Sequence, residues 1–161
     1  MPARAGAFLA ALLLSVVWLG LPAQAFGPAD RPDFRTTSIS LDRGDGTILK
    51  FSVELAESPR QHAYGLMHVE AMAPDEGMLF VFQSNARRSF WMKNTLIPLD
   101  MLFFDETGLL VTAIRDVPAH SLTPRHSSAD ATYVLELNAG TAGSAGIGIG
   151  ARLLLPVSET E

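Results

Sequence analysis

A small set of aromatic, basic and acidic residues holds the side chains with which this chain could do chemistry. The set consists of Trp91, Lys93, Asn94, Asp100, Glu136, Asn138 and, nearer the N-terminus, Arg60. In an extended strand, Trp91 and Lys93 point to the same face. In a later strand, Glu136 and Asn138 do the same. An indole offers a stacking platform, and the polar groups can hold a ligand or move protons. The set therefore predicts a small concave site.

The two carboxyls of this set need an explanation because their neighbours are apolar. Asp100 precedes Met-Leu-Phe-Phe, and Glu136 lies within Tyr-Val-Leu-Glu-Leu. Burying a bare charge in such surroundings is costly, so each carboxyl must be solvated, hydrogen-bonded or paired. Lys93 and Arg60 are the basic side chains that we expect within reach.

A purely structural interpretation fits the same residues. Asn94 can bond its own turn, and Asp100 can cap a chain reversal. Glu136 can close one ion pair with Lys93. Buried polar groups are normally satisfied in this way, and structural networks perturb pKa values as readily as active sites do.

One enzymatic alternative uses Asp100 and Glu136 as the paired carboxylates of a small hydrolase. The chain offers little else for catalysis, since it has no cysteine and no Gly-x-Ser-x-Gly motif. His120 and His126 have serines beside them, but they stand in a polar loop, where such residues are usually only solvated. Binding is therefore favoured over catalysis.

A second alternative is a periplasmic accessory protein that handles copper. Thioether and imidazole groups bind copper(I), and the candidate ligands are Met67, His68, Met78 and Met92. Methionine is, however, the usual filler of irregular core gaps, and most of these residues stand at apolar-periodic positions. The histidines of the polar loop lack the spacing and third ligand of a zinc site. We predict no metal site and no cofactor.

Period-two alternation predicts a mostly β domain of about eight strands, with one short helix near residues 59–67. Ser58 and Pro59 form the start signal of that helix, and Gly65 within it indicates close contact with a strand. The chain lacks regular strand–helix–strand alternation, which favours an antiparallel sheet or a small open β-barrel. The expected strands are 37–41, 48–55, 77–82, 90–94, 100–104, 109–114, 131–138 and 151–157.

Several long motifs resemble those of the domain of unknown function 192 family. They are Gly-Leu-Met at 65–67, the runs 77–82, 89–95 and 98–105, and Tyr-Val-Leu-Glu-Leu-Asn-Ala-Gly at 133–140. The resemblance covers roughly residues 39–155 and concentrates on the polar set described above. It implies a fold and an exported protein, but it implies no reaction.

The N-terminus has the pattern of a secretory signal peptide. Arg4 precedes an apolar run at 7–21, and Ala-Gln-Ala at 23–25 is a small-x-small cleavage site. We therefore expect residues 1–25 to be removed, residues 26–36 to form a flexible leader and residues 37–157 to form one β-rich domain. The product is expected in the periplasm or outside the cell.

The exported chain is acidic. Removal of residues 1–25 leaves 11 basic against 17 acidic residues, a net charge of −6. This balance argues against nucleic acid and anionic membrane surfaces as partners. The preferred hypothesis is a binding module that holds a small molecule or an envelope protein at Trp91, Lys93 and Glu136.

Overall fold

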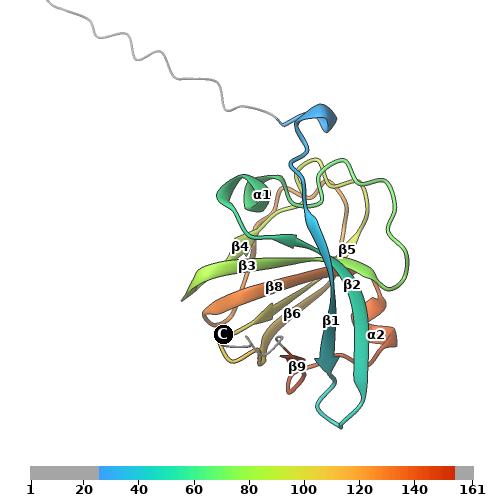
Figure 1. Ribbon diagram of the computed structural model, residues 1–161, viewed down its shortest axis with the longest axis vertical. Helices are drawn as coiled ribbons and strands as arrows, with labels where there is room; N and C mark the ends of the chain where they lie inside the picture. The colour runs from blue at the N-terminus through green and yellow to red at the C-terminus, as the bar shows by residue number, and fades with distance from the viewer. Residues whose placement is uncertain (1–25, 155–161) are drawn as a thin grey trace, which may run out of the picture.

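The structure is a computed structural model that describes residues 26–154, and its main element is one strongly curled β-sheet (Figure 1). The predicted signal peptide and the end of the predicted closing strand, residues 155–157, lie outside the described residues. The strands are β1 (Arg35–Asp42), β2 (Ile48–Ala56), β3 (Glu76–Ala86), β4 (Ser89–Phe90), β5 (Leu99–Phe104), β6 (Leu110–Val117), β7 (Arg125–His126), β8 (Ala131–Asn138) and β9 (Arg152–Leu154). The helices are η1 (Pro28–Asp30), α1 (Pro59–Tyr64) and α2 (Thr141–Ser144).

Seven strands form the sheet, in the order β6-β5-β8-β3-β2-β1-β9, and β4 pairs separately with β7. Strands β2 and β3 are parallel, and the other paired strands are antiparallel. In Figure 1, β1 and β2 run across the front of β3 and β8, so the sheet folds over on itself. Helix α1 lies in the crossover between the two parallel strands.

The curled sheet closes where its two ends meet. Leu109 forms an isolated bridge with Arg152, and the main-chain nitrogen of Leu153 donates to the carbonyl of Gly108 at 2.8 Å. These contacts join β9, at one edge of the sheet, to the turn before β6, at the other edge. The predicted mostly β fold is confirmed as a curled half-barrel, although its sheet is not purely antiparallel, because β2 and β3 are parallel.

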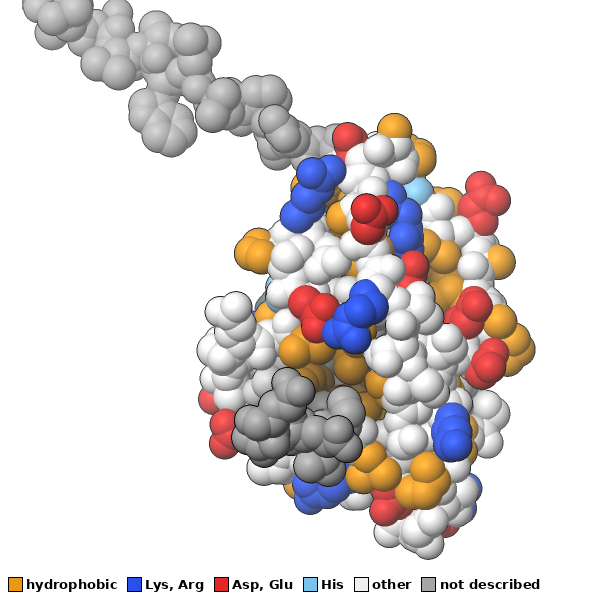
Figure 2. Space-filling view, in the orientation of Figure 1, with side chains coloured by type: hydrophobic (Ala, Val, Ile, Leu, Met, Phe, Trp, Pro, Cys, Tyr) orange, Lys and Arg blue, Asp and Glu red, His pale blue; other side chains and the backbone are white. Residues whose placement is uncertain are grey.

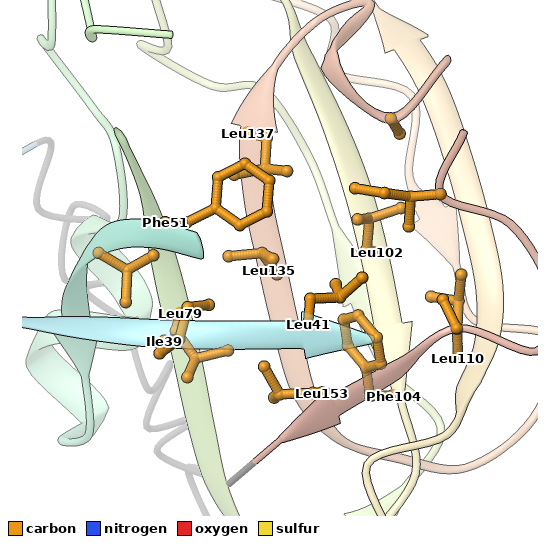
Figure 3. Packing of buried hydrophobic residues seen from close by; sticks show 14 of the residues in the cluster. Ile39, Leu41, Phe51, Leu79, Leu102, Phe104, Leu110, Leu135, Leu137 and Leu153 are labelled. Atoms are coloured by element: carbon orange, nitrogen blue, oxygen red, sulfur yellow. The ribbon is translucent and has the colours of Figure 1, made fainter. Parts of the chain in front are cut away.

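The sheet carries apolar side chains on both faces. On the inner face, residues from β1 and from β5 and β8 point toward one another across the barrel (Figure 3). The outer face carries a second buried cluster, which includes Met78, Phe80, Met101, Phe103 and Val134. Because both faces are covered, a polar side chain on a central strand has no direct path to bulk water.

The sequence of α1 explains both its start and its end. The hydroxyl of Ser58 accepts from the main-chain nitrogen of Gln61, whose side-chain oxygen accepts in return from the nitrogen of Ser58. Pro59 occupies the first helical position, as predicted. The helix stops at Tyr64, not at residue 67, because Gly65 adopts a φ of +53°. The expected close contact of Gly65 is with the ring of Phe80 in β3.

One further segment differs from the predicted elements, and the expected leader contains a short helix. The expected strand 90–94 is wrong: β4 ends at Phe90, and Asn94 has a φ of +57°. The chain instead forms a loop whose Met92 nitrogen donates to the carbonyl of Ser121. In the segment 26–36, η1 lies beside α1, since Arg60 donates to the carbonyl of Asp30. Among residues 26–154 there is no helix with the length and hydrophobicity needed to cross a bilayer.

The contact that closes the barrel gives a prediction about Gly108. Its φ is +81°, and a Cβ at this position would lie 2.4 Å from the carbonyl oxygen of Leu153. Gly140 has a similar φ of +84° and nothing within 4 Å of such a Cβ, so Gly140→Ala is a matched control for backbone strain alone. In urea denaturation, Gly108→Ala should cost roughly 1–3 kcal/mol more stability than Gly140→Ala. Equal losses of unfolding free energy in the two variants would show that β9 can shift away from residue 108 at no cost.

Candidate functional site

A cavity of about 650 Å³ lies between α1, the outer face of β3, and the loop that follows β4. Its wall is mainly apolar and aromatic, with a few polar groups. The lining residues are Phe26, Pro59, His62, Ala63, Tyr64, Gly65, Leu66, Met67, Phe80, Phe82, Ser89, Phe90, Trp91, Lys93, Asn94, Thr95 and Glu136. The crossover from β2 to β3 places α1 over the sheet and thereby forms one side of this cavity.

Glu136 forms the buried acidic part of the wall. On β8 it pairs in register with Met78 of β3 and Met101 of β5, so the three side chains form one row on the outer face. Both methionines have no exposed surface, and Glu136 is only 4% exposed. This apolar burial raises the pKa of the Glu136 carboxyl from 4.5 to about 8. The group is therefore mainly protonated at neutral pH.

The Glu136 carboxyl has no bonding partner within residues 26–154, where neither a hydrogen bond nor an ion pair to it is found. In the same part of the chain, every fully enclosed side-chain nitrogen or oxygen has a hydrogen-bond partner. The Glu136 oxygens therefore face the cavity instead of being sealed in the core. A buried, unpartnered acid that faces an open space is a place for a ligand group.

Phe90 organises the aromatic part of the wall. Its ring meets Phe80 edge to face at 4.9 Å between centroids, and it meets Phe82 at 6.4 Å. His62 of α1 lies against Phe82, with 4.4 Å between ring centroids. The His62 Nε2 is within hydrogen-bond distance of two main-chain carbonyls, which fixes the imidazole in place. These contacts form a pre-arranged wall of ring faces and edges.

Trp91 and Lys93 flank the mouth of the cavity. The indole is 52% exposed, and the Lys93 ammonium lies over it, 5.4 Å from the ring centroid. Asn94 lies in the same loop and has a left-handed backbone conformation. Its side-chain amide donates to the sulfur of Met67 at 3.8 Å. The carbonyl of Asn94 accepts from the nitrogen of His68 at 2.9 Å, which ties this loop to the end of α1.

Four of the seven residues that the sequence singled out line this cavity, namely Trp91, Lys93, Asn94 and Glu136. The other three lie elsewhere. Arg60 donates to the carbonyl of Asp30, and the amide of Asn138 donates to the carbonyls of Met72 and Ala73. The suggested ion pair of Lys93 with Glu136 is not present, because the ammonium lies over the indole instead.

Asp100 has the structural role that the sequence left open. Its carboxylate accepts from the main-chain nitrogens of Asp116, at 2.9 Å, and Ala142, at 2.8 Å. These two bonds tie β6 and α2 to β5. The side chain is fully buried, so both nitrogens would lose their partner if it were removed.

The paired-carboxylate hydrolase is wrong for this fold. Asp100 is the strand partner of Leu137, whereas Glu136 is the partner of Met101. Neighbouring residues on a strand point to opposite faces, so Asp100 points into the barrel and Glu136 points outward. The sheet separates the two acids, and no substrate bond can lie between them.

The positions of the methionines are typical of core residues and not of copper ligands. Met78 and Met92 are almost fully buried in the outer cluster, and of the four copper(I) candidates only Met67 lines the cavity. The Nε2 of His68 instead lies 3.1 Å from the main-chain carbonyl oxygen of Phe26, to which it can donate. Within residues 26–154 there is no group of three histidine or acidic side chains with the geometry of a metal site.

Comparisons with known proteins agree with this geometry at the level of family and fold. The profile of the family called domain of unknown function 192 (DUF192), described as an uncharacterised ACR, matches residues 40–155. This chain belongs to the DUF192 family. No curated protein matches it significantly.

Two solved structures are similar to this chain. A Sinorhizobium meliloti protein, described as a candidate transcription regulator, is 40% identical, with a TM-score of 0.75 over 77% of this chain and 96% of its own. A Novosphingobium aromaticivorans protein of unknown function is 25% identical, with a TM-score of 0.72 over 82% of this chain and 99% of its own. This chain thus shares its fold with these two proteins, and the comparisons name no ligand.

Sequence reasoning missed the α1 side of the site in this DUF192 protein. His62, Tyr64 and the rings of β3 line the cavity but were not singled out. The available signal was the helix start at Ser58, which lies between two strands. A strand–helix–strand unit places its helix on one face of a parallel pair, and the polar residues of that helix then face the strand ends.

The burial of Glu136 predicts how stability changes with pH. In the unfolded chain the carboxyl ionises near its ordinary value of 4.5, whereas the folded protein keeps the proton up to about pH 8. Between these values the folded state binds one more proton, so rising pH favours unfolding. Relative to Glu136→Gln, the wild type should lose roughly 1.4 kcal/mol of unfolding free energy per pH unit from pH 5 to 8.

Urea denaturation of both proteins across this pH range measures that difference. Parallel stability curves for wild type and Glu136→Gln would mean that the carboxyl is solvated or paired. The burial described above would then be incorrect.

Proposed function

We propose that this protein is an exported binding module that holds a small, largely apolar ligand in the cavity beneath α1. The observation that carries the proposal is the Glu136 carboxyl, which is 4% exposed, unpartnered within residues 26–154 and open to that cavity. A structural carboxyl at this depth is normally bonded, as Asp100 is on the other face of the same sheet. A bound ligand supplies the missing partner.

The size and composition of the cavity support the same proposal. Small-molecule sites typically measure about 300–1,000 Å³ and combine apolar walls with a few placed polar groups. The cavity of about 650 Å³ lies within that range, and its polar groups include Glu136 and, at the mouth, Lys93. The exposed indole of Trp91 can close over a ligand or meet a segment of an envelope protein.

The description of the Sinorhizobium protein as a transcription regulator is not carried over to this chain. On the face shown in Figure 2, acidic and basic side chains are interspersed. The proposed mature chain has 17 acidic and 11 basic residues, and an acidic excess opposes binding to phosphates.

The proposal of export rests on the N-terminal sequence. Cleavage after Ala25 would leave Phe26 as the first residue, and Phe26 belongs to the cavity wall. Its ring lies against Tyr64, with 5.9 Å between centroids, and its carbonyl is 3.1 Å from the Nε2 of His68. The cleaved chain therefore keeps every residue that lines the cavity.

Export predicts a defined mature N-terminus. When the full chain is expressed in a bacterium with two membranes, mass spectrometry of the periplasmic fraction should find protein that begins at Phe26. Replacement of Ala23 and Ala25 by leucine should block processing, since the signal peptidase site needs small residues. Unprocessed protein confined to the cytoplasm would refute export.

Ligand binding can be tested before the natural ligand is known. The neutral apolar fluorophore N-phenyl-1-naphthylamine should bind the protein with one site and an increase in emission. Ala63→Trp, at an exposed position of the cavity wall, should reduce the affinity at least tenfold by filling the mouth. Ser144→Trp adds the same ring at an exposed position on α2 and should leave the affinity unchanged.

Trp91→Ala tests the platform in the same titration and should weaken binding by roughly 1–2 kcal/mol, because it removes a large apolar contact. Equal affinity in all four proteins would show that the fluorophore binds elsewhere. It would remove the cavity as the binding site.

A further inference from the structure

We propose that the ligand is an organic monocation, a protonated amine with an aromatic or aliphatic body, whose ammonium group meets Glu136. The inference rests on the proposed binding site and names the chemical class that this site takes. Its basis is the distribution of charge and aromatic rings around the cavity.

The first step concerns the absence of a cationic partner for Glu136 among the described residues. Its two row neighbours, Met78 and Met101, are apolar, and no cation of the described chain forms an ion pair with it. Lys93 is the basic side chain in the cavity wall, and its ammonium lies over Trp91 at the mouth. An ammonium group that enters with the ligand would pair with the acid in a place of low dielectric, where the attraction is strong.

The second step concerns the walls above the acid. Phe90 meets both Phe80 and Phe82 edge to face, and the guanidinium of Arg88 already lies over the Phe82 ring, 3.8 Å from its centroid. Ring faces attract cations, and the attraction grows when the cation is desolvated. An apolar body on the same molecule gains from contact with these rings. An anion would meet the same ring faces, which repel it, and a carboxyl that repels it once ionised.

The third step explains the limit to one positive charge. The ammonium of Lys93 stands at the mouth, beside an exposed indole, where water and salt screen it. It therefore opposes a deep cation only weakly. A second cation at the outer end of the ligand would lie close to it and be disfavoured. The outer end of the ligand is neutral or anionic.

Binding of such a cation is coupled to the release of a proton. The titratable groups that line the same cavity as Glu136 are His62 and Tyr64 from α1 and Lys93 from the loop, whereas its strand partners on β3 and β5 are methionines. Burial holds the pKa of the Glu136 carboxyl near 8, so at pH 7 the acid is mostly neutral. The carboxyl loses its proton to solvent as the ammonium enters, and a carboxylate–ammonium pair forms. Affinity should rise about tenfold per pH unit until about pH 8.

Three probes of similar shape and different charge test the inference: 2-phenylethylamine, 2-phenylethanol and 3-phenylpropionate. Each is titrated against the purified protein with N-phenyl-1-naphthylamine bound. At pH 8 the amine should compete at least tenfold better than the alcohol, and the acid should compete worst. Between pH 6 and 7.5 the affinity for the amine should rise steeply, while that for the alcohol stays level.

Variants assign these effects to single groups. Calorimetry at pH 7 in buffers of different ionisation enthalpy should show about one proton released per amine bound by the wild type. Glu136→Gln should abolish both the proton release and the preference for the amine while it still binds the alcohol. Proton release that persists in Glu136→Gln would assign it to another group, such as His62, and overturn the inference.

The charge at the mouth is tested with a diamine. The wild type should prefer hexylamine to 1,6-diaminohexane by at least threefold, and Lys93→Ala should reduce that preference. If the alcohol competes as well as the amine, and Ala63→Trp still blocks the fluorophore, the cavity binds a neutral ligand. The amine class is then rejected, and the proposed binding function remains. If no probe or fluorophore responds to Ala63→Trp, both fail.

Discussion

The fold depends on the fact that the central strands of the sheet are covered on both faces. Strand β8 sends Leu135 and Leu137 into the barrel and Val134 and Glu136 to the outer layer. Each side chain on such a strand must pack among apolar neighbours or find a bonding partner, because water does not reach it directly. Asp100 obeys this rule on the inner face through two main-chain nitrogens. Glu136 has no such bonding partner among the described residues, and its carboxyl faces the cavity instead.

The cavity itself follows from the one parallel pair in the sheet. An antiparallel hairpin between β2 and β3 would need only a short turn, whereas the parallel arrangement needs a crossover that passes over one face. Helix α1 lies in that crossover and is short, with Gly65 ending it directly over Phe80. A longer helix with side chains in place of Gly65 would fill the space that now separates α1 from Glu136. The same crossover thus belongs to the topology and forms one wall of the cavity.

Much of the fold could be predicted from the alternation of apolar residues, but the site could be predicted only in part. Alternation correctly separated Glu136 from the leucines beside it, and capping residues located α1. The strand assigned to Trp91 and Lys93 failed because Asn94 adopts a left-handed conformation, which asparagine tolerates and a strand pattern does not reveal. The sheet register, which puts Asp100 and Glu136 on opposite faces, comes from long-range pairing of β5 with β8. No local pattern contains that pairing.

A structural explanation of Glu136 has to name what the acid stabilises. Its neighbours in the row are methionines, its carboxyl is bonded to no group of residues 26–154, and its ionisation near neutral pH works against folding. Leucine or methionine at this position would fill the row at no electrostatic cost. Asp100 shows what a structural acid in this sheet looks like, since its removal would leave two buried nitrogens without acceptors. Glu136 has the opposite properties: it costs stability, and it directs a titratable group into a space lined by aromatic rings. These properties are the basis of our proposal that the acid contacts a ligand in the cavity.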